Sequence, residues 1–147
     1  MAAPKWDYSE PTFRAACQRG LLIGGHLVRN EQIRLITNTP KTGRVYRRRG
    51  VEHRASAPGE PPASDIGALV QSIGVPTPVA GALAVDIAVS AKHASYLEFG
   101  TTRMAPRPFI RPAADNVVDD VTNAILRELR AVDCGLTGGR TVIQGRR

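Results

Sequence analysis

The longest regular pattern of apolar and polar positions in the chain is helical and runs over residues 9–37. Apolar or small residues recur there at steps of three, four or seven positions, namely Phe13, Cys17, Leu21, Gly24, Val28 and Leu35. Ser9 is a residue type favoured as an N-cap, and the spacing predicts an amphipathic helix of about seven turns. Glycines inside this helix indicate either a close approach by another element or a kink. They are Gly20, Gly24 and Gly25.

A second helical pattern covers residues 113–132. Its apolar stripe consists of branched aliphatic residues, namely Val117, Val121, Ile125, Leu129 and Val132. Acidic residues lie near the start of this segment and arginines near its end, which suits the helix dipole. The pattern therefore predicts a C-terminal amphipathic helix. The glycine-rich residues 133–147 are predicted to form a flexible tail.

Between the two helical segments the periodicity is that of strands. Large apolar residues alternate with small or polar ones over residues 83–89, which is typical of a half-buried strand. Residues 70–75 form a second apolar run, and a turn at residues 80–82 joins the two runs as a predicted antiparallel hairpin. We also expect a helical turn over residues 66–70 and a last short strand at residues 109–110.

Residues 38–63 carry a dense positive charge. The cations are Lys41, Arg44, Arg47, Arg48, Arg49 and Arg54, against Glu52 and Glu60. A proline-rich stretch at residues 55–63 follows, of a composition that a packed element would not use. The segment is therefore predicted to be an extended arm or a loose hairpin, with Arg49 and Gly50 near its tip.

Two interpretations of this arm are consistent with its composition. It is either a charged arm that reaches a neighbouring subunit or DNA, or a solvated flexible loop. We favour an interaction role, because arginine clusters with an embedded tyrosine suit phosphate or carboxylate partners.

Residues 96–112 form a basic, proline-rich connector. We expect a short helical turn over residues 92–100 that ends at Gly100. Prolines then hold an extended path, because proline fixes its own φ and restricts the preceding residue. The residues predicted to anchor this connector in the fold are Tyr96, Leu97, Phe99, Gly100, Pro106, Pro108 and Phe109.

Together these patterns predict an α+β fold in one domain over residues 1–132. Its elements are a long N-terminal helix, a small antiparallel sheet with an extended basic arm, and a C-terminal amphipathic helix.

The formal net charge is +7, and 17 of the 20 basic residues are arginine. Arginine favours planar, bidentate contacts with carboxylate or phosphate, so this balance indicates a nucleic-acid partner or an acidic protein surface. The base composition of a genome can also enrich arginine without any functional reason.

The residue types that carry catalysis or bind metals are sparse. Cys17 and Cys134 lie far apart, and no two histidines are spaced as metal ligands on one helix. Phosphate-binding loops and paired catalytic carboxylates are not recognisable either. We therefore expect no enzyme activity, no metal site and no cofactor. No signal peptide and no apolar run long enough to span a membrane is visible, so we expect no membrane partner.

Two segments resemble one known family. Residues 55–63, Ala-Ser-Ala-Pro-Gly-Glu-Pro-Pro-Ala, precede the hairpin, and Tyr96-Leu97-Glu98-Phe99-Gly100-Thr101 is followed by the proline-rich run from Met104 to Ala113. In this order, after a long helix and a basic stretch, they resemble the head–tail connector family of tailed bacteriophages. Members of this family are described as neck, tail-completion or minor tail component proteins. The resemblance covers residues 10–132, and residues 133–147 have no counterpart in it.

The resemblance implies a structural virion protein of the phage neck that assembles in the bacterial host cytoplasm. It would form a homo-oligomeric, most simply hexameric, ring between the portal-side head assembly and the tail. Its neighbours would be a head-closure or adaptor protein and a tail terminator or tail tube, with double-stranded DNA passing through the lumen. The residues predicted to reach a neighbouring subunit or ring are Arg44, Tyr46, Arg47, Arg48, Arg49, Arg103, Met104, Arg107 and Arg111.

Several alternatives stay open from the sequence. The protein could itself be a tail terminator or a head-closure ring, and a basic nucleic-acid-binding module is a more distant alternative. The arm has either protein or DNA as its partner. We favour protein, because strong arginine contacts to phosphate would slow DNA passing through the ring. Residues 100–112, the part of the connector after the helical turn, form either an inter-subunit loop or an internal crossover of the core.

Overall fold

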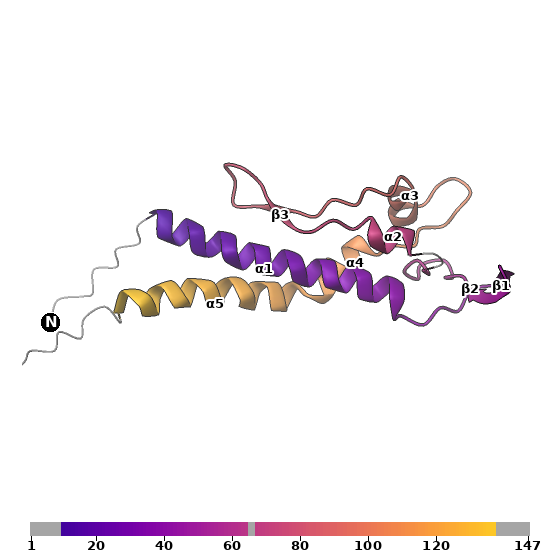
Figure 1. Ribbon diagram of the computed structural model, residues 1–147, viewed down its shortest axis with the longest axis horizontal. Helices are drawn as coiled ribbons and strands as arrows, with labels where there is room; N and C mark the ends of the chain where they lie inside the picture. Colours follow the sequence, from indigo (N-terminus) through magenta and orange to yellow (C-terminus); the bar gives the residue numbers. More distant parts are fainter. Residues whose placement is uncertain (1–9, 65–66, 138–147) are drawn as a thin grey trace, which may run out of the picture.

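The computed structural model describes residues 10–64 and 67–137 and shows an elongated α+β molecule (Figure 1). Two long helices, α1 (Glu10–Thr37) and α5 (Val118–Thr137), run antiparallel and side by side along its length. The strands form two separate two-stranded antiparallel sheets rather than one. The α+β class, the long N-terminal helix and the C-terminal amphipathic helix are thus confirmed.

The glycines of α1 allow close packing on two of its sides. A Cβ atom added at Gly20 would lie 2.6 Å from the Cα of Ile125, and one added at Gly24 would lie 2.7 Å from a methyl of Val121. At Gly25 the added atom would instead meet Pro76, at 2.8 Å. The helix is continuous over these positions, so the glycines mark close approach by α5 and by the middle of the chain.

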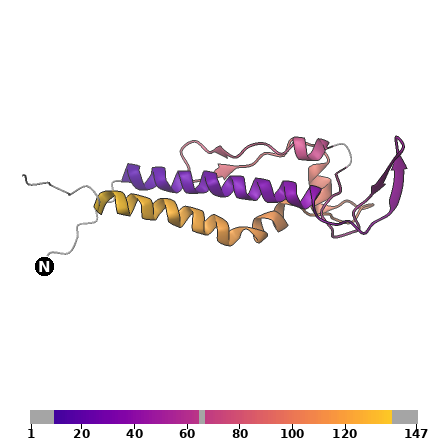
Figure 2. The ribbon, with the colours of Figure 1, turned by 60° about the horizontal axis from the view of Figure 1, so that its bottom comes forward.

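The middle of the chain covers α1 on the side away from α5 (Figure 2). It contains α2 (Ala68–Gln71), β3 (Thr77–Pro78), β4 (Val85–Asp86) and α3 (Ala94–Phe99). The two strands pair antiparallel, with Thr77 opposite Asp86. The short helix α3 and the turn through Gly81 (φ 76°) match their predictions.

The predicted strand at residues 70–75 is wrong, since β3 lies after it, and the strand predicted at residues 83–89 is too long. Val70 belongs to α2, and the longer pairing is reduced to the two-residue ladder and one isolated bridge between Ile73 and Val89. Pro76 and Pro78 explain the short ladder, because proline has no N–H to donate to a neighbouring strand.

The predicted strand at residues 109–110 is also wrong. Phe109 occupies the N-cap position of a further helix, α4 (Ile110–Asn116), and Val117 separates α4 from α5. The second helical pattern is therefore two helices. The last one continues to Thr137, past the boundary predicted at residue 132, while the rest of the predicted tail lies outside the described residues.

The basic segment forms a hairpin beyond the C-terminal end of α1 (Figure 2). Its strands β1 (Val45–Arg48) and β2 (Val51–Arg54) pair antiparallel, with Arg48 opposite Val51. The turn residues Arg49 and Gly50 have positive φ angles of 51° and 81°, as tight two-residue hairpin turns require. The hairpin with its tip at these residues matches the prediction for the arm.

The apolar core lies where the end of α1 meets α2, α3 and α4. Its buried members are Ile36, Leu69, Ile73, Ala94 and Phe109. Phe109 is fully buried, which explains why the chain returns to α1 at this point. Across residues 10–64 and 67–137, no helix combines the length and the apolar character that a membrane span requires.

We predict that Gly20→Ala lowers stability, although alanine normally gains about 1 kcal/mol over glycine inside a helix. The new methyl group meets the backbone of Ile125, and overpacking of this kind costs about 1–3 kcal/mol. Urea unfolding measures the difference. The control is Asn30→Ala at an exposed position of α1, which should not destabilise the protein. A Gly20→Ala variant as stable as this control would contradict the close helix contact.

Candidate functional site

The arm presents its cations to solvent. Arg47, Arg48 and Arg49 are all exposed, and Tyr46 stacks on His53 across the hairpin with 5.6 Å between ring centroids. The outer edges of the two strands pair with no other strand in the described part of the chain. An isolated two-stranded hairpin of this kind is only marginally stable in water.

The root of the arm is held by one carboxylate. Glu60 accepts hydrogen bonds from the hydroxyl of Thr42 (2.5 Å), the backbone N–H of Thr42 (3.1 Å) and the N–H of Ala57 (2.8 Å). These bonds, that of the Thr42 hydroxyl first, lower the pKa of Glu60 from 4.5 to about 2. The Gly59 N–H also donates to the carbonyl of Pro106 at 3.0 Å, which joins the arm root to the connector.

A second carboxylate, that of Glu98 on α3, caps α4. It accepts hydrogen bonds from the backbone N–H groups of Phe109, Ile110 and Arg111 at 2.8, 2.9 and 3.0 Å. These N–H groups have no partner inside the helix, and a negative charge there also favours the helix dipole. Sequence reasoning missed this cap because Glu98 lies 11 residues before the first group it binds, outside any local capping motif.

Between Glu98 and Phe109 the connector turns sharply. Gly100 has a φ of 76°, and an added Cβ would lie 2.8 Å from the carbonyl oxygen of Met104. The turn from Thr101 to Met104 is closed by the Thr101 N–H, which donates to the Met104 carbonyl at 2.8 Å. Arg103 lies exposed at this turn, and Met104 is half-buried. The predicted stop at Gly100 therefore coincides with a position that needs glycine.

The predicted anchors divide into buried and exposed residues. Leu97 packs on the core and Phe109 is fully buried, whereas Pro106 is exposed and Pro108 half-buried. The prediction is wrong for two aromatic residues, which do not plug the core of their own chain. They are Tyr96, with 57% of its surface exposed, and Phe99, with 80%. Glu98 and Leu97 lie on the face of α3 that is turned toward the rest of the chain, which leaves Tyr96 and Phe99 on the exposed face.

A pocket of about 320 Å³ lies between the arm root, α2 and α3. Its lining includes Tyr46 and Arg107, so two predicted interface residues from distant parts of the chain meet here. The backbone N–H of Arg107 donates to the carbonyl of Leu97 at 2.6 Å. The buried Nε of the Arg107 side chain has no hydrogen-bond partner in the described part of the chain.

The other predicted interface residues are not brought to this pocket. Arg44 lies at the base of the arm, where its carbonyl accepts a hydrogen bond from the Ala55 N–H at 2.9 Å. Arg111 lies on α4, exposed, with Asp115 at 4.0 Å. Arg103 and Met104 occupy the connector turn. The candidate site is therefore an extended surface from the arm to the connector, and not a single cleft.

A larger groove, which sequence reasoning missed, lies between α1 and α5. Its volume is about 660 Å³. The residues that line it are Ile23, Leu27, Asp120, Asn123, Ala124, Leu126, Arg127 and Arg130. The sequence signal for this groove was Leu126, an apolar residue that lies beside the predicted stripe of the C-terminal helix.

Among the described residues, no group of three or more histidine, cysteine, aspartate or glutamate side chains is arranged to hold a metal ion. Comparison of this chain with protein-family models, with curated proteins and with solved structures gave no match.

We predict that Glu98→Ala destabilises the protein by about 2–3 kcal/mol, because three N–H groups at the start of α4 lose a charged acceptor. Glu98→Gln keeps a neutral acceptor, so its stability in thermal or urea unfolding should lie between that of the wild type and that of Glu98→Ala. The control is Glu52→Ala on the exposed face of the arm, with an expected change below about 0.5 kcal/mol. Wild-type stability in Glu98→Ala would show that water replaces the cap.

We predict that the arm root loosens only in strong acid. A carboxylate whose pKa is lowered on folding contributes its full stability above the unfolded value near 4.5, and loses that contribution as the pH falls through about 2. The amide signal of Thr42 should therefore titrate near pH 2 in NMR spectra, and the Glu60→Gln variant should lack this step. A midpoint near pH 4.5 would contradict the bonding described for Glu60.

Proposed function

We propose that this protein is a structural component of the neck of a tailed-bacteriophage particle, a head–tail connector or tail-completion protein. Copies of the chain form a homo-oligomeric, hexameric ring that joins the portal-side head assembly to the tail and lets double-stranded DNA pass. The proposal begins from the resemblance of residues 55–63 and 96–113. No catalytic role enters it.

The observation that carries the proposal is the arm. It is an arginine-rich, two-stranded hairpin that lies beyond the C-terminal end of α1, and its strands pair with no third strand among the described residues (Figure 1). A single small chain gains little from such an element, because the hairpin buries little of its own surface and concentrates like charge. In a ring, each arm reaches an adjoining subunit or ring, and the partner supplies both the missing strand contacts and the opposing charge.

We favour a protein partner for the arm over DNA. The exposed guanidinium groups of Arg47, Arg48 and Arg49 suit carboxylates of an adjoining chain, since guanidinium groups bind carboxylates in a planar geometry. The arm also lacks the series of exposed aromatic rings on which nucleic-acid bases stack, because Tyr46 is paired with His53. DNA moving through a lumen is better served by a surface without strong phosphate contacts.

The test replaces Arg47, Arg48 and Arg49 together, once by alanine and once by lysine. We expect negligible duplex binding at physiological salt for the wild type and both variants. Assembly of particles otherwise lacking this protein should fail with the alanine variant. The lysine variant keeps the charge but loses bidentate geometry, so it should restore assembly only in part. Circular dichroism shows whether each variant keeps its helices.

A different pattern would overturn the proposal. It consists of tight duplex binding by the wild type, loss of that binding with alanine but not with lysine, and normal particle assembly throughout. That result would support a nucleic-acid-binding module, whose charge matters more than its geometry.

A further inference from the structure

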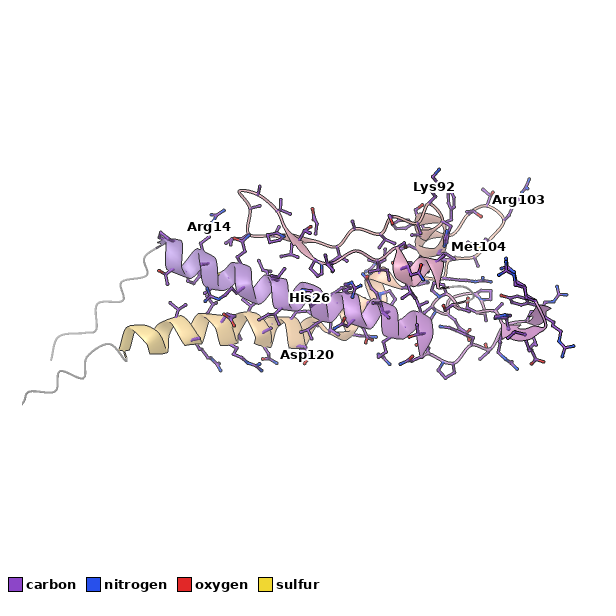
Figure 3. All side chains as sticks on the ribbon, viewed as in Figure 1. Arg14, His26, Lys92, Arg103, Met104 and Asp120 are labelled. Carbon is purple, nitrogen blue, oxygen red and sulfur yellow. The ribbon has the colours of Figure 1, made fainter. Side chains whose placement is uncertain are left out.

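One face of the molecule carries an exposed aromatic pair on α3, here called the knob and consisting of Tyr96 and Phe99. The two residues are three positions apart, so they lie on the same face of the helix. Phe99 is 80% exposed, more than any other large hydrophobic side chain in the described part of the chain. Lys92 precedes the knob in the chain and Arg103 follows it, and both side chains lie exposed on the same side of the molecule as α3 (Figure 3).

The groove between α1 and α5 is lined by polar and apolar side chains, and both helices contribute exposed apolar residues to it. Ile23 and Leu126 remain 44% and 41% exposed in it. Its volume of about 660 Å³ is within the range that proteins use to enclose ligands much larger than a phenyl ring. Charge along the groove is asymmetric: Asp120 lies toward the N-terminal end of α5, and Arg127 and Arg130 lie toward the other end.

The knob and the groove lie on opposite faces. In Figure 3, Lys92 and Arg103 point away from α1 on the side of α3, whereas Asp120 points outward on the side of α5. No chain can therefore fill its own groove with its own knob. Two complementary surfaces on opposite faces of one chain produce a head-to-tail contact, and such contacts close into a ring when the rotation between copies allows it.

We propose that the knob of one copy docks into the α1–α5 groove of the next copy. Phe99 packs against Ile23 and Leu126, and the exposed cations before and after the knob lie toward Asp120. Arg127 and Arg130 repel those cations at the opposite end of the groove, so only one orientation of the neighbour is favoured. This inference rests on the ring proposed above and names the contact that builds it.

Two variants separate the two halves of this contact. Phe99→Asp removes the knob and leaves the groove intact, and Leu126→Asp removes the groove and leaves the knob intact. Both positions are exposed, so the isolated chains should keep wild-type circular dichroism spectra. Each variant alone should be monomeric by native mass spectrometry under conditions in which the wild type forms rings.

The mixture of the two variants gives the decisive result. One intact knob and one intact groove remain between the two chains, so a 1:1 heterodimer should form and growth should stop there, without rings. The matched control is Val75→Asp, which places the same charge at a residue that is 61% exposed and belongs neither to the knob nor to the lining of the groove. This control should assemble like the wild type.

Charge reversal tests the orientation. Arg103→Glu should raise the protein concentration needed for ring formation at least tenfold. Adding Asp120→Arg in the same chain should lower that concentration again in part. A photo-crosslinking residue at position 99 gives an independent readout. Rings made from a mixture of isotopically light and heavy copies distinguish crosslinks between copies from crosslinks within one copy. The residue at position 99 should crosslink to α5 or α1 of a different copy.

Other outcomes would overturn the contact. Rings that form normally from both aspartate variants would exclude the knob and groove while leaving the proposed ring in place. Disruption by Leu126→Asp but not by Phe99→Asp would show that grooves pack against each other about a twofold axis. A wild type that remains monomeric both in solution and in particles would overturn the ring and the contact together.

Discussion

The close contacts of α1 at its glycines set the arrangement of the whole molecule. Gly20 and Gly24 let α5 approach one side of the helix, while Gly25 lets Pro76 and β4 approach another. Helix α1 is therefore covered on two sides by segments that do not cover each other. Since a domain this small has one modest core, the surfaces left over on α3 and on α5 are separated by the thickness of α1.

Charge is sorted between the helices and the arm. On α1, Arg14 and Arg29 donate to the carbonyls of Gly81 and Gly74 at 2.7 and 3.0 Å, and so fasten the middle of the chain. Glu31, only 9% exposed, binds both Arg34 and Asn116, and the bond from Arg34 is the main cause of its lowered pKa. These arginines serve the fold, whereas those of the arm extend into solvent. The formal net charge of +7 is therefore unevenly distributed. The helical body exposes less positive charge than this number indicates, and the arm exposes positive charge at a higher density.

The parts of the fold that depend on local pattern were predictable, and the parts that depend on distant partners were not. Helical spacing located α1 and α5, and Arg49-Gly50 located the hairpin tip, because these signals act within a few residues. The start of α4 was missed because its cap comes from Glu98, across the connector. Tyr96 and Phe99 were assigned to the core on hydrophobicity alone, which cannot separate burial within a chain from burial between chains. The groove required the paired helices, so no single segment indicated it.

The hydrogen bond from Gly59 to the Pro106 carbonyl has a mechanical consequence. It links the base of the arm to the loop that carries Arg103, and Glu60 fixes that base to Thr42 close after the end of α1. A force applied at the tip of the arm is thus divided between the long helix and the connector. A displacement of the arm is therefore passed on to the loop beside α3 that carries Arg103.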